Sequence, residues 1–261
     1  MLMGAQEEMQ VQTLEFPPQP ALLSVPALGP ASIHLWYAQP LERRSLFADL
    51  SALLSPEEDD RRTQLRFEGN RQDFVFARGM LRTLLAAYLE TDPRGLRFQY
   101  SEHGKPSLAG SDAENELQFN LSHTQGAVLL AICRRRAIGV DIERVREDFS
   151  VQEIAERFFS LAERQALMRL PEAERRPAFF RCWTRKEAFL KARGHGLSFP
   201  LDRFDVSIGA DETEVRLTTR PDPMEAQDWQ ILQAPAPEGY AAAVALASSP
   251  SALNDWKGGW R

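Results

Sequence analysis

Hydrophobic and polar residues alternate one by one in the middle of this chain. Ile138, Val140 and Ile142 would lie on one face of a strand, because successive side chains of a strand point to opposite faces. Asp141 and Glu143 would then share the other face. The pattern therefore predicts a strand that buries one side and carries two carboxylates on the other.

Further strands are expected wherever apolar residues alternate or run continuously between turn residues. We expect the strands that lie between residues 119 and 143 to be antiparallel neighbours in one sheet. The expected strands cover residues 33–37, 96–100, 119–123, 127–133, 138–143, 204–208, 215–217, 229–232 and 240–246.

Apolar residues at helical spacing predict helices between these strands. Ser55, Pro56 and Glu58 mark a helix start, with Ser55 as the cap, Pro56 in the first position and Glu58 in the third. A break is expected from Pro171 to Pro177. The expected helices cover residues 41–54, 55 to beyond 62, 71–89, 154–170 and 178–192.

A second group of polar residues lies on the last of these helices. Trp183, Glu187 and Lys191 are four residues apart and share one face of a helix. If this face packs beside Asp141 and Glu143, three carboxylates and a lysine converge, and such hard oxygen donors suit Mg²⁺. The alternative is that these are the solvated face of a sheet and an ordinary exposed helical ion pair.

The two halves of the chain resemble each other at a constant spacing of 105 residues. Ile33 corresponds to Ile138, Ser55 to Ser160, and Phe74 to Phe179. This weak repeat indicates a duplication. It predicts an α+β fold of two similar halves about a pseudo-twofold axis. Each half would hold a small, mainly antiparallel sheet and a long packed helix, with the active site in the cleft between the halves.

Composition limits the class of protein. The 261 residues are 43% hydrophobic and carry a net charge of −6, with a pI near 5.4, so we expect a folded protein without a broad nucleic-acid-binding surface. The two cysteines predict reduced, packed thiols, and no run approaches the length of a membrane span, so we expect no membrane partner and a cytoplasmic location.

Proline is concentrated at the start of the chain, which predicts a loosely ordered lead-in over residues 1–30. The N-terminal half would cover 31–136 and the C-terminal half 137–247, followed by a tail over 248–261. A duplication inside one chain favours a monomer.

Four motifs together give the chain a family resemblance. Their order and spacing resemble those of the 4′-phosphopantetheinyl transferases, most nearly the two-halved form that activates peptide synthetases. The motifs are Phe119-Asn120-Leu121-Ser122-His123, Ile138-Gly139-Val140-Asp141-Ile142-Glu143, Arg157-Phe158-Phe159-Ser160, and the run from Trp183 through Glu187 and Lys191 to Gly194-His195-Gly196-Leu197.

The resemblance implies an enzyme that moves the phosphopantetheine arm of coenzyme A to a serine of an apo acyl or peptidyl carrier protein, releasing 3′,5′-adenosine bisphosphate. It implies that Asp141, Glu143 and Glu187 hold Mg²⁺, or Mn²⁺ in its place, at the pyrophosphate. Glu187 becomes the candidate base for the serine hydroxyl, and Lys191 the group that stabilises charge on the leaving phosphate.

The resemblance also implies the residues that bind coenzyme A. Ser122 and His123 match positions at the nucleotide phosphates, and Lys105 matches a lysine near the coenzyme's phosphates. Arg66 and Arg71 lie where the family places basic residues for the 3′-phosphate. The alternatives are a histidine satisfied at a strand end and an exposed turn lysine. The sequence departs from the family in the acidic run Glu57-Glu58-Asp59-Asp60, where relatives often carry lysines.

An acidic carrier protein requires a basic surface, and several arginines and lysines could form one. The alternative for each is solvated surface charge. These residues are Arg144, Arg146, Arg181, Arg185, Lys186 and Arg193.

Two other functions use the same residues. A metal-dependent nucleotide phosphohydrolase would employ the acids with water as nucleophile, although no second acidic cluster is evident. A non-catalytic module that binds coenzyme A would make the acids structural.

Overall fold

The computed structural model describes residues 9–19, 23–110, 116–194, 199–212 and 214–249. Most of the predicted tail lies outside these residues, as does the His195-Gly196-Leu197 part of the last motif. The strands are β1 (Gln10–Glu15), β2 (Ser32–Ala38), β3 (Phe98–Tyr100), β4 (Pro106–Leu108), β5 (Leu117–Thr124), β6 (Ala127–Arg134), β7 (Ile138–Arg144), β8 (Phe204–Val206), β9 (Glu214–Val215), β10 (Leu217–Thr219), β11 (Trp229–Gln233) and β12 (Tyr240–Ala247). The helices are η2 (Pro40–Leu46), α1 (Phe47–Ser51), α2 (Pro56–Gln64), α3 (Glu68–Leu89), α4 (Val151–Phe158), α5 (Leu161–Arg169), α6 (Glu172–Arg193), η5 (Leu201–Arg203) and η6 (Pro223–Asp228).

The described strands form two four-stranded sheets, one in each half, and two small hairpin-like pairs. The N-terminal sheet has the order β1-β2-β6-β5 and the C-terminal sheet the order β7-β12-β11-β9. All pairs in these sheets are antiparallel except β1 with β2. Because β2, β6 and β5 occupy the same order as β7, β12 and β11, the sheets confirm the predicted similarity of the halves.

The helices of the two halves repeat the same local chemistry. Ser55 caps α2 and Ser160 caps α5, each in a capping box with the glutamate three residues later. In the N-terminal half that glutamate binds Arg82 of α3, and in the C-terminal half it binds Lys186 of α6. Each cation also donates to a backbone carbonyl beyond its helix, that of Leu96 or Phe204. Duplication thus extends to a buried ion pair that joins two helices.

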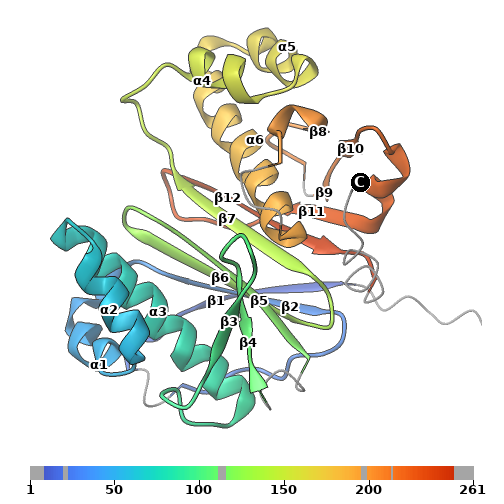
Figure 1. The fold of residues 1–261 in the computed structure, drawn as a ribbon. Helices are drawn as coiled ribbons and strands as arrows, with labels where there is room; N and C mark the ends of the chain where they lie inside the picture. The colour runs from blue at the N-terminus through green and yellow to red at the C-terminus, as the bar shows by residue number, and fades with distance from the viewer. Residues whose placement is uncertain (1–8, 20–22, 111–115, 195–198, 213, 250–261) are drawn as a thin grey trace, which may run out of the picture.

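The two sheets pack face to face, and each half's helices cover its outer side (Figure 1). Apolar residues of β2 and β6 meet Ile138, Val140 and Ile142 of β7 in the core between the sheets. A second core lies between α3 and the N-terminal sheet, and a third between α6 and the C-terminal sheet. The apolar face predicted for residues 138–142 is therefore confirmed, since it forms the junction of the halves.

Two expectations about the strands were wrong. The lead-in is not wholly loose, because β1 pairs in parallel with β2 and Phe16 is fully buried against Phe76. Most of β1 is an exposed edge strand, so its sequence lacks a buried apolar face. β7 is also not a sheet neighbour of β5 and β6, because it pairs with β12 near the end of the chain.

Two expected helices also differ in extent. Residues 154–170 form two helices, because Ser160 caps a new one after the first ends at Phe158. The expected break before residue 178 is instead part of α6, which begins at Glu172 and contains Pro177. Pro177 lacks an N–H donor and its ring crowds the carbonyl four residues earlier, but it lies within two turns of the helix start, so the helix continues beyond it.

In the described part of the chain, no helix is both long and apolar enough to cross a membrane. The two cysteines, Cys133 and Cys182, are buried free thiols, as expected.

Candidate active site

Strand β5 presents different chemistry on its two faces. Leu121 and His123 line a large cleft on one face. Asn120, Ser122 and Thr124 point the other way and bond to β7. This alternation places the cleft and the predicted acids on opposite sides of a single strand.

Helix α6 lies directly against β7, and Gly139 makes that approach possible. A Cβ atom at this position would lie 2.1 Å from the carbonyl oxygen of Ala188 and 2.2 Å from the nitrogen of Ala192. No larger residue fits between backbones at that distance. The approach brings Asp141 of β7 next to the Glu187 and Lys191 side of the helix, as the two motifs predicted.

Lys191 and Ser122 both bind the carboxylate of Asp141. The lysine Nζ lies 2.6 Å from Asp141 Oδ1 and 2.9 Å from Ser122 Oγ, and Ser122 Oγ donates to the same Oδ1 at 2.8 Å. Thr124 Oγ1 donates to Glu143 Oε2 at 3.2 Å. Side chains from β5, β7 and α6 are therefore joined by hydrogen bonds at the junction of the halves.

The carboxylates of this cluster are incompletely neutralised. Asp141 Oδ2 and Glu187 Oε1 are buried and have no hydrogen-bond partner. Burial raises the pKa of Glu187 to about 7, the charges of Asp141 and Glu143 add to the shift, and Lys191 opposes it. Burial, followed by the charge of Asp141, also raises the pKa of Glu143. Buried oxygens without donors and mutually repelling acids are the environment that a hard divalent cation stabilises.

The side chains are not closed around a single point. Among the described residues, no group of three or more His, Cys, Asp or Glu side chains lies close enough to form a ready metal site. The two orphaned oxygens belong to Asp141 and Glu187, whereas Glu143 has Thr124 as a donor. Asp141 and Glu187 thus fit a metal by their chemistry, and Glu143 lies beside them.

A cleft of about 900 Å³ opens on the other face of β5. Its walls come from α2, α3, the β3–β4 region and β5, so they belong to the N-terminal half. Arg61, Arg94 and Arg97 line it, and none of them forms an ion pair with a carboxylate in the described part of the chain. Phe74 and Phe98 supply apolar wall.

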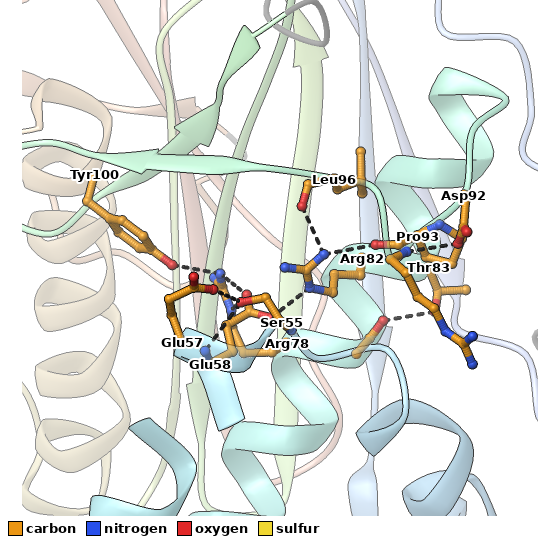
Figure 2. Close-up of polar contacts among 12 residues, drawn as sticks. Ser55, Glu57, Glu58, Arg78, Arg82, Thr83, Asp92, Pro93, Leu96 and Tyr100 are labelled. Carbon is orange, nitrogen blue, oxygen red and sulfur yellow. Dashed lines mark hydrogen bonds and ion pairs between the residues drawn. The ribbon is translucent and has the colours of Figure 1, made fainter. Parts of the chain in front are cut away.

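Two further arginines in the cleft share one carboxylate, that of Glu58 (Figure 2). Arg82 Nε donates to Glu58 Oε2 at 2.7 Å, and Arg78 Nε donates to Oε1 at 2.8 Å. Arg78 also donates to the hydroxyl of Tyr100 at 2.8 Å and lies over the ring of Phe98. The acidic run that departs from the family pattern therefore places one glutamate in a buried structural network.

His123 is exposed at the cleft, on the strand that also carries Ser122. The protein packed around its ring lowers the pKa of His123, Asp73 opposes this, and Lys191 lowers it further. The neighbouring residue Ser122, on the other face of β5, binds Asp141. His123 and Ser122 thus face the cleft and the acids, respectively, from adjacent positions of one strand.

Three residues predicted to bind coenzyme A, Lys105, Arg66 and Arg71, do not line the cleft. The ammonium of Lys105 is turned inward and donates to the carbonyls of Lys191 at 2.7 Å, Ile138 at 2.9 Å and Ala192 at 3.2 Å. The last carbonyls of a helix attract a cation, which explains this departure from the expected phosphate contact.

Arg66 and Arg71 do not line the cleft either. Arg66 stacks over Phe67, and Arg71 bonds to the carbonyl of Leu65 and to Glu68. Both lie where α2 ends and α3 begins, whereas the arginines that line the cleft come from α2, from the middle of α3 and from residues 94–97.

The expected basic rim on α6 is largely absent. Arg185 and Lys186 are fully buried, and Arg193 is 8% exposed and paired with Glu225. They bind carbonyls and acids inside the C-terminal half, because α6 is packed on more than one side. Arg144 and Arg146 are exposed, as expected.

Sequence patterns missed several residues that build this site. Asn120 and Gly139 hold β7 in place, and Arg61, Arg94 and Arg97 line the cleft. The alternation of Phe119-Asn120-Leu121-Ser122-His123 did contain a signal, because it places Asn120 on the same face as Ser122. No local pattern distinguishes the three arginines from other surface arginines.

Comparisons with known proteins agree with this architecture. The family description "4'-phosphopantetheinyl transferase superfamily" matches residues 137–245, and "4'-phosphopantetheinyl transferase, N-terminal" matches residues 38–135. The 4'-phosphopantetheinyl transferase HetI of Nostoc is 36% identical over 231 residues, covering 88% of this chain and 92% of the relative. The chain belongs to the 4′-phosphopantetheinyl transferase superfamily.

Other members of the superfamily match over most of the chain. The 4'-phosphopantetheinyl transferase Sfp of Bacillus subtilis is 28% identical, covering 75% of this chain and 83% of the relative. The human L-aminoadipate-semialdehyde dehydrogenase-phosphopantetheinyl transferase is 31% identical over 211 residues, covering 74% of this chain and 67% of the relative. The resemblance found in the sequence is therefore confirmed.

Proposed function

We propose that this chain transfers the 4′-phosphopantetheine arm of coenzyme A to a serine hydroxyl of an apo acyl or peptidyl carrier protein and releases 3′,5′-adenosine bisphosphate. The observation that carries the proposal is the cluster of Asp141, Lys191 and Ser122, beside the perturbed Glu187, across strand β5 from an arginine-lined cleft. Membership of the phosphopantetheinyl transferase superfamily supports it.

The nucleotide end of coenzyme A fits the cleft. Its volume of about 900 Å³ is of the size that small-molecule sites occupy, and apolar walls can receive a base. Arg61, Arg94 and Arg97 supply guanidinium groups without carboxylate partners in the described chain, and such groups bind phosphate through paired donors. We therefore assign the 3′-phosphate to these arginines in place of Arg66 and Arg71.

The acid cluster is the proposed magnesium site, with manganese as a possible substitute. Asp141, Glu143 and Glu187 would hold the ion, since two of them carry buried oxygens that lack a donor. When bound, the ion would neutralise charge on the pyrophosphate of coenzyme A.

The protein's own groups would then carry the proton and the charge. Glu187 has a pKa near neutrality and would accept the proton of the carrier's serine hydroxyl as its oxygen attacks the phosphorus next to pantetheine. The bond from that phosphorus to the bridging oxygen breaks, and the electron pair leaves with 3′,5′-adenosine bisphosphate. Lys191 would stabilise that leaving phosphate, and Ser122 and His123 would donate to phosphate oxygens.

In this proposal the two halves of the chain have different roles. Residues 31–136 would bind the nucleotide, and residues 137–247 would supply the metal ligands, the base and Lys191. We further propose that the enzyme is monomeric and cytoplasmic and acts without nucleic acid or membrane. Among the residues expected to form the basic rim, Arg144 and Arg146 are exposed, and they would attract an acidic carrier.

Intact-mass spectrometry of an apo carrier protein incubated with this chain, coenzyme A and magnesium tests the proposal. The expected result is a gain of the phosphopantetheine mass that disappears when magnesium is chelated. Hydrolysis of coenzyme A without carrier modification would support the phosphohydrolase. Binding of coenzyme A without turnover on acyl, peptidyl and aryl carriers would support the non-catalytic module.

A further inference from the structure

We infer that Lys105 and Asn120, two side chains of the N-terminal half, position Asp141 and Lys191 by binding the backbone on either side of them. This inference rests on the proposed function, because it assigns meaning to the geometry of the Asp141–Lys191 pair. It makes Lys105 a positioning residue and gives no phosphate contact to it.

The first observation concerns the free edge of β7. β7 pairs with β12 along one edge, and the backbone groups of Ile138, Val140 and Ile142 point to the other edge. Buried backbone donors without partners are costly. The N–H of Val140 donates to Asn120 Oδ1 at 2.8 Å, and that of Ile142 donates to Ser122 Oγ at 3.4 Å. Side chains of β5 thus replace a missing neighbouring strand on both sides of Asp141.

The second observation concerns Lys105, which lies between β3 and β4. Its three N–H donors match three carbonyls, those of Ile138 on β7 and of Lys191 and Ala192 at the end of α6. Carbonyls of the last helical turn have no partner within the helix. One ammonium therefore ties the beginning of β7 to the end of the helix that carries Lys191.

The third observation is that neither side chain lines the cleft, although Gly104 and Pro106 do. Asn120 is 5% exposed, and burial lowers the pKa of Lys105 to about 8. Groups in these positions act through the backbone of the acids and of Lys191. The ion pair of 2.6 Å between Lys191 and Asp141 is therefore held from both of its ends by the other half of the molecule.

The variants Asn120→Leu and Lys105→Met test this inference, because each keeps the approximate size of the side chain and removes the bonds. Thr219→Val is the matched control, since Thr219 is buried and donates to a backbone carbonyl, that of Asp222, outside the site. The assays are the steady-state rate of carrier modification, calorimetric titration with coenzyme A, and hydrogen exchange of the peptide that contains β7.

We expect both variants to lower kcat by roughly 10- to 100-fold, the cost of a misplacement of about 1 Å, with coenzyme A affinity changed by less than about twofold. Exchange of β7 should accelerate in both variants and stay unchanged in Thr219→Val. Lys105→Arg keeps a charged donor and should restore part of the turnover and protection.

Three results would overturn the inference. A weaker affinity for coenzyme A with unchanged kcat in Lys105→Met would make Lys105 a phosphate ligand. An unchanged kcat in both folded variants, or slow β7 exchange in both, would remove the positioning role. If the unmodified chain does not modify any carrier, the proposed function fails by itself, and the exchange experiment still reports whether the side chains hold β7.

Discussion

Glu187 should destabilise the metal-free fold, and replacing it with glutamine should make the protein more stable. The carboxylate is partly buried, one of its oxygens has no donor, and its pKa rises from 4.5 to about 7. Glutamine has nearly the same shape and carries no charge. It therefore removes the cost of holding an ionised group beside Asp141 and Glu143.

The size of the effect follows from the pKa shift. A rise of about 2.5 pKa units corresponds to about 3 kcal/mol of free energy of unfolding, at 1.36 kcal/mol per unit. The folded state binds the proton more tightly than the unfolded state. Relative to Glu187→Gln, the free energy of unfolding of the unmodified protein is therefore highest below about pH 4.5. It falls as the pH rises through about 7, where Glu187 loses its proton in the folded state.

Denaturant unfolding in a metal chelator at pH 5 and pH 8.5 measures this effect. At pH 8.5 Glu187→Gln should be more stable than the unmodified protein by up to about 3 kcal/mol, and at pH 5 by about 1 kcal/mol. Thermal scans at pH 8.5 should show a Tm higher by roughly 6–12 °C. Added magnesium should stabilise the unmodified protein more than the variant.

The same substitution in a paired acid provides the control. Glu163 is buried and lies 2.6 Å from the ammonium of Lys186, so Glu163→Gln should destabilise the protein at both pH values. A Glu187→Gln variant that is less stable at pH 8.5, or a difference independent of pH, would refute the reasoning about the acid cluster.

Three further predictions follow from the site and its packing. Lys191→Met should lower kcat by roughly 100-fold or more with little change in coenzyme A binding, because it removes charge stabilisation, and equal losses in both would contradict this. Arg61→Gln should raise the KM for coenzyme A several-fold, most strongly at low salt, whereas Arg66→Gln, outside the cleft, should leave it unchanged. Similar effects of the two variants would contradict the placement of the nucleotide in the cleft. Gly139→Ala should cost at least about 1–3 kcal/mol in chemical unfolding, because its Cβ would lie 2.1 Å from the carbonyl oxygen of Ala188, and a neutral result would contradict the close approach.

Short-range patterns predicted the parts of the site that are determined locally. Alternation placed Asp141 and Glu143 on one face of a strand, and helical spacing placed Glu187 and Lys191 on one face of a helix. The capping box at Ser55 was predicted from a serine followed three residues later by glutamate, whereas the same pattern at Ser160 was overlooked when one helix was expected over residues 154–170. These features depend on φ and ψ periodicity and on contacts within a few residues.

Long-range contacts decided the features that sequence analysis missed. Lys186 and Arg193 look like surface charges on a helix, yet each is buried against an acid that lies more than 20 residues away in the chain. Lys105 is separated from the carbonyl of Lys191 by 86 residues. A sequence pattern states the charge of such a side chain, whereas its partner depends on how the elements pack.

The pairing of β7 shows the same limit. Its partner β12 begins at Tyr240, about a hundred residues later, and the intervening chain forms α4, α5 and α6. Strand patterns do not encode which edge a strand joins, and neighbours in sequence were the simpler expectation. The internal repeat was the better guide, because it related β7 to β2 and thus to a separate sheet.

The central claim is that the cluster around Glu187 performs the transfer while the arginine-lined cleft binds coenzyme A. Single-turnover carrier modification by Glu187→Gln, with coenzyme A binding measured on the same preparation, tests it most directly. We predict coenzyme A affinity within about twofold of the unmodified protein and a transfer rate lower by roughly 100- to 10,000-fold, the range for loss of a general base. A transfer rate within a few-fold of the unmodified protein, at unchanged coenzyme A affinity, would contradict the account.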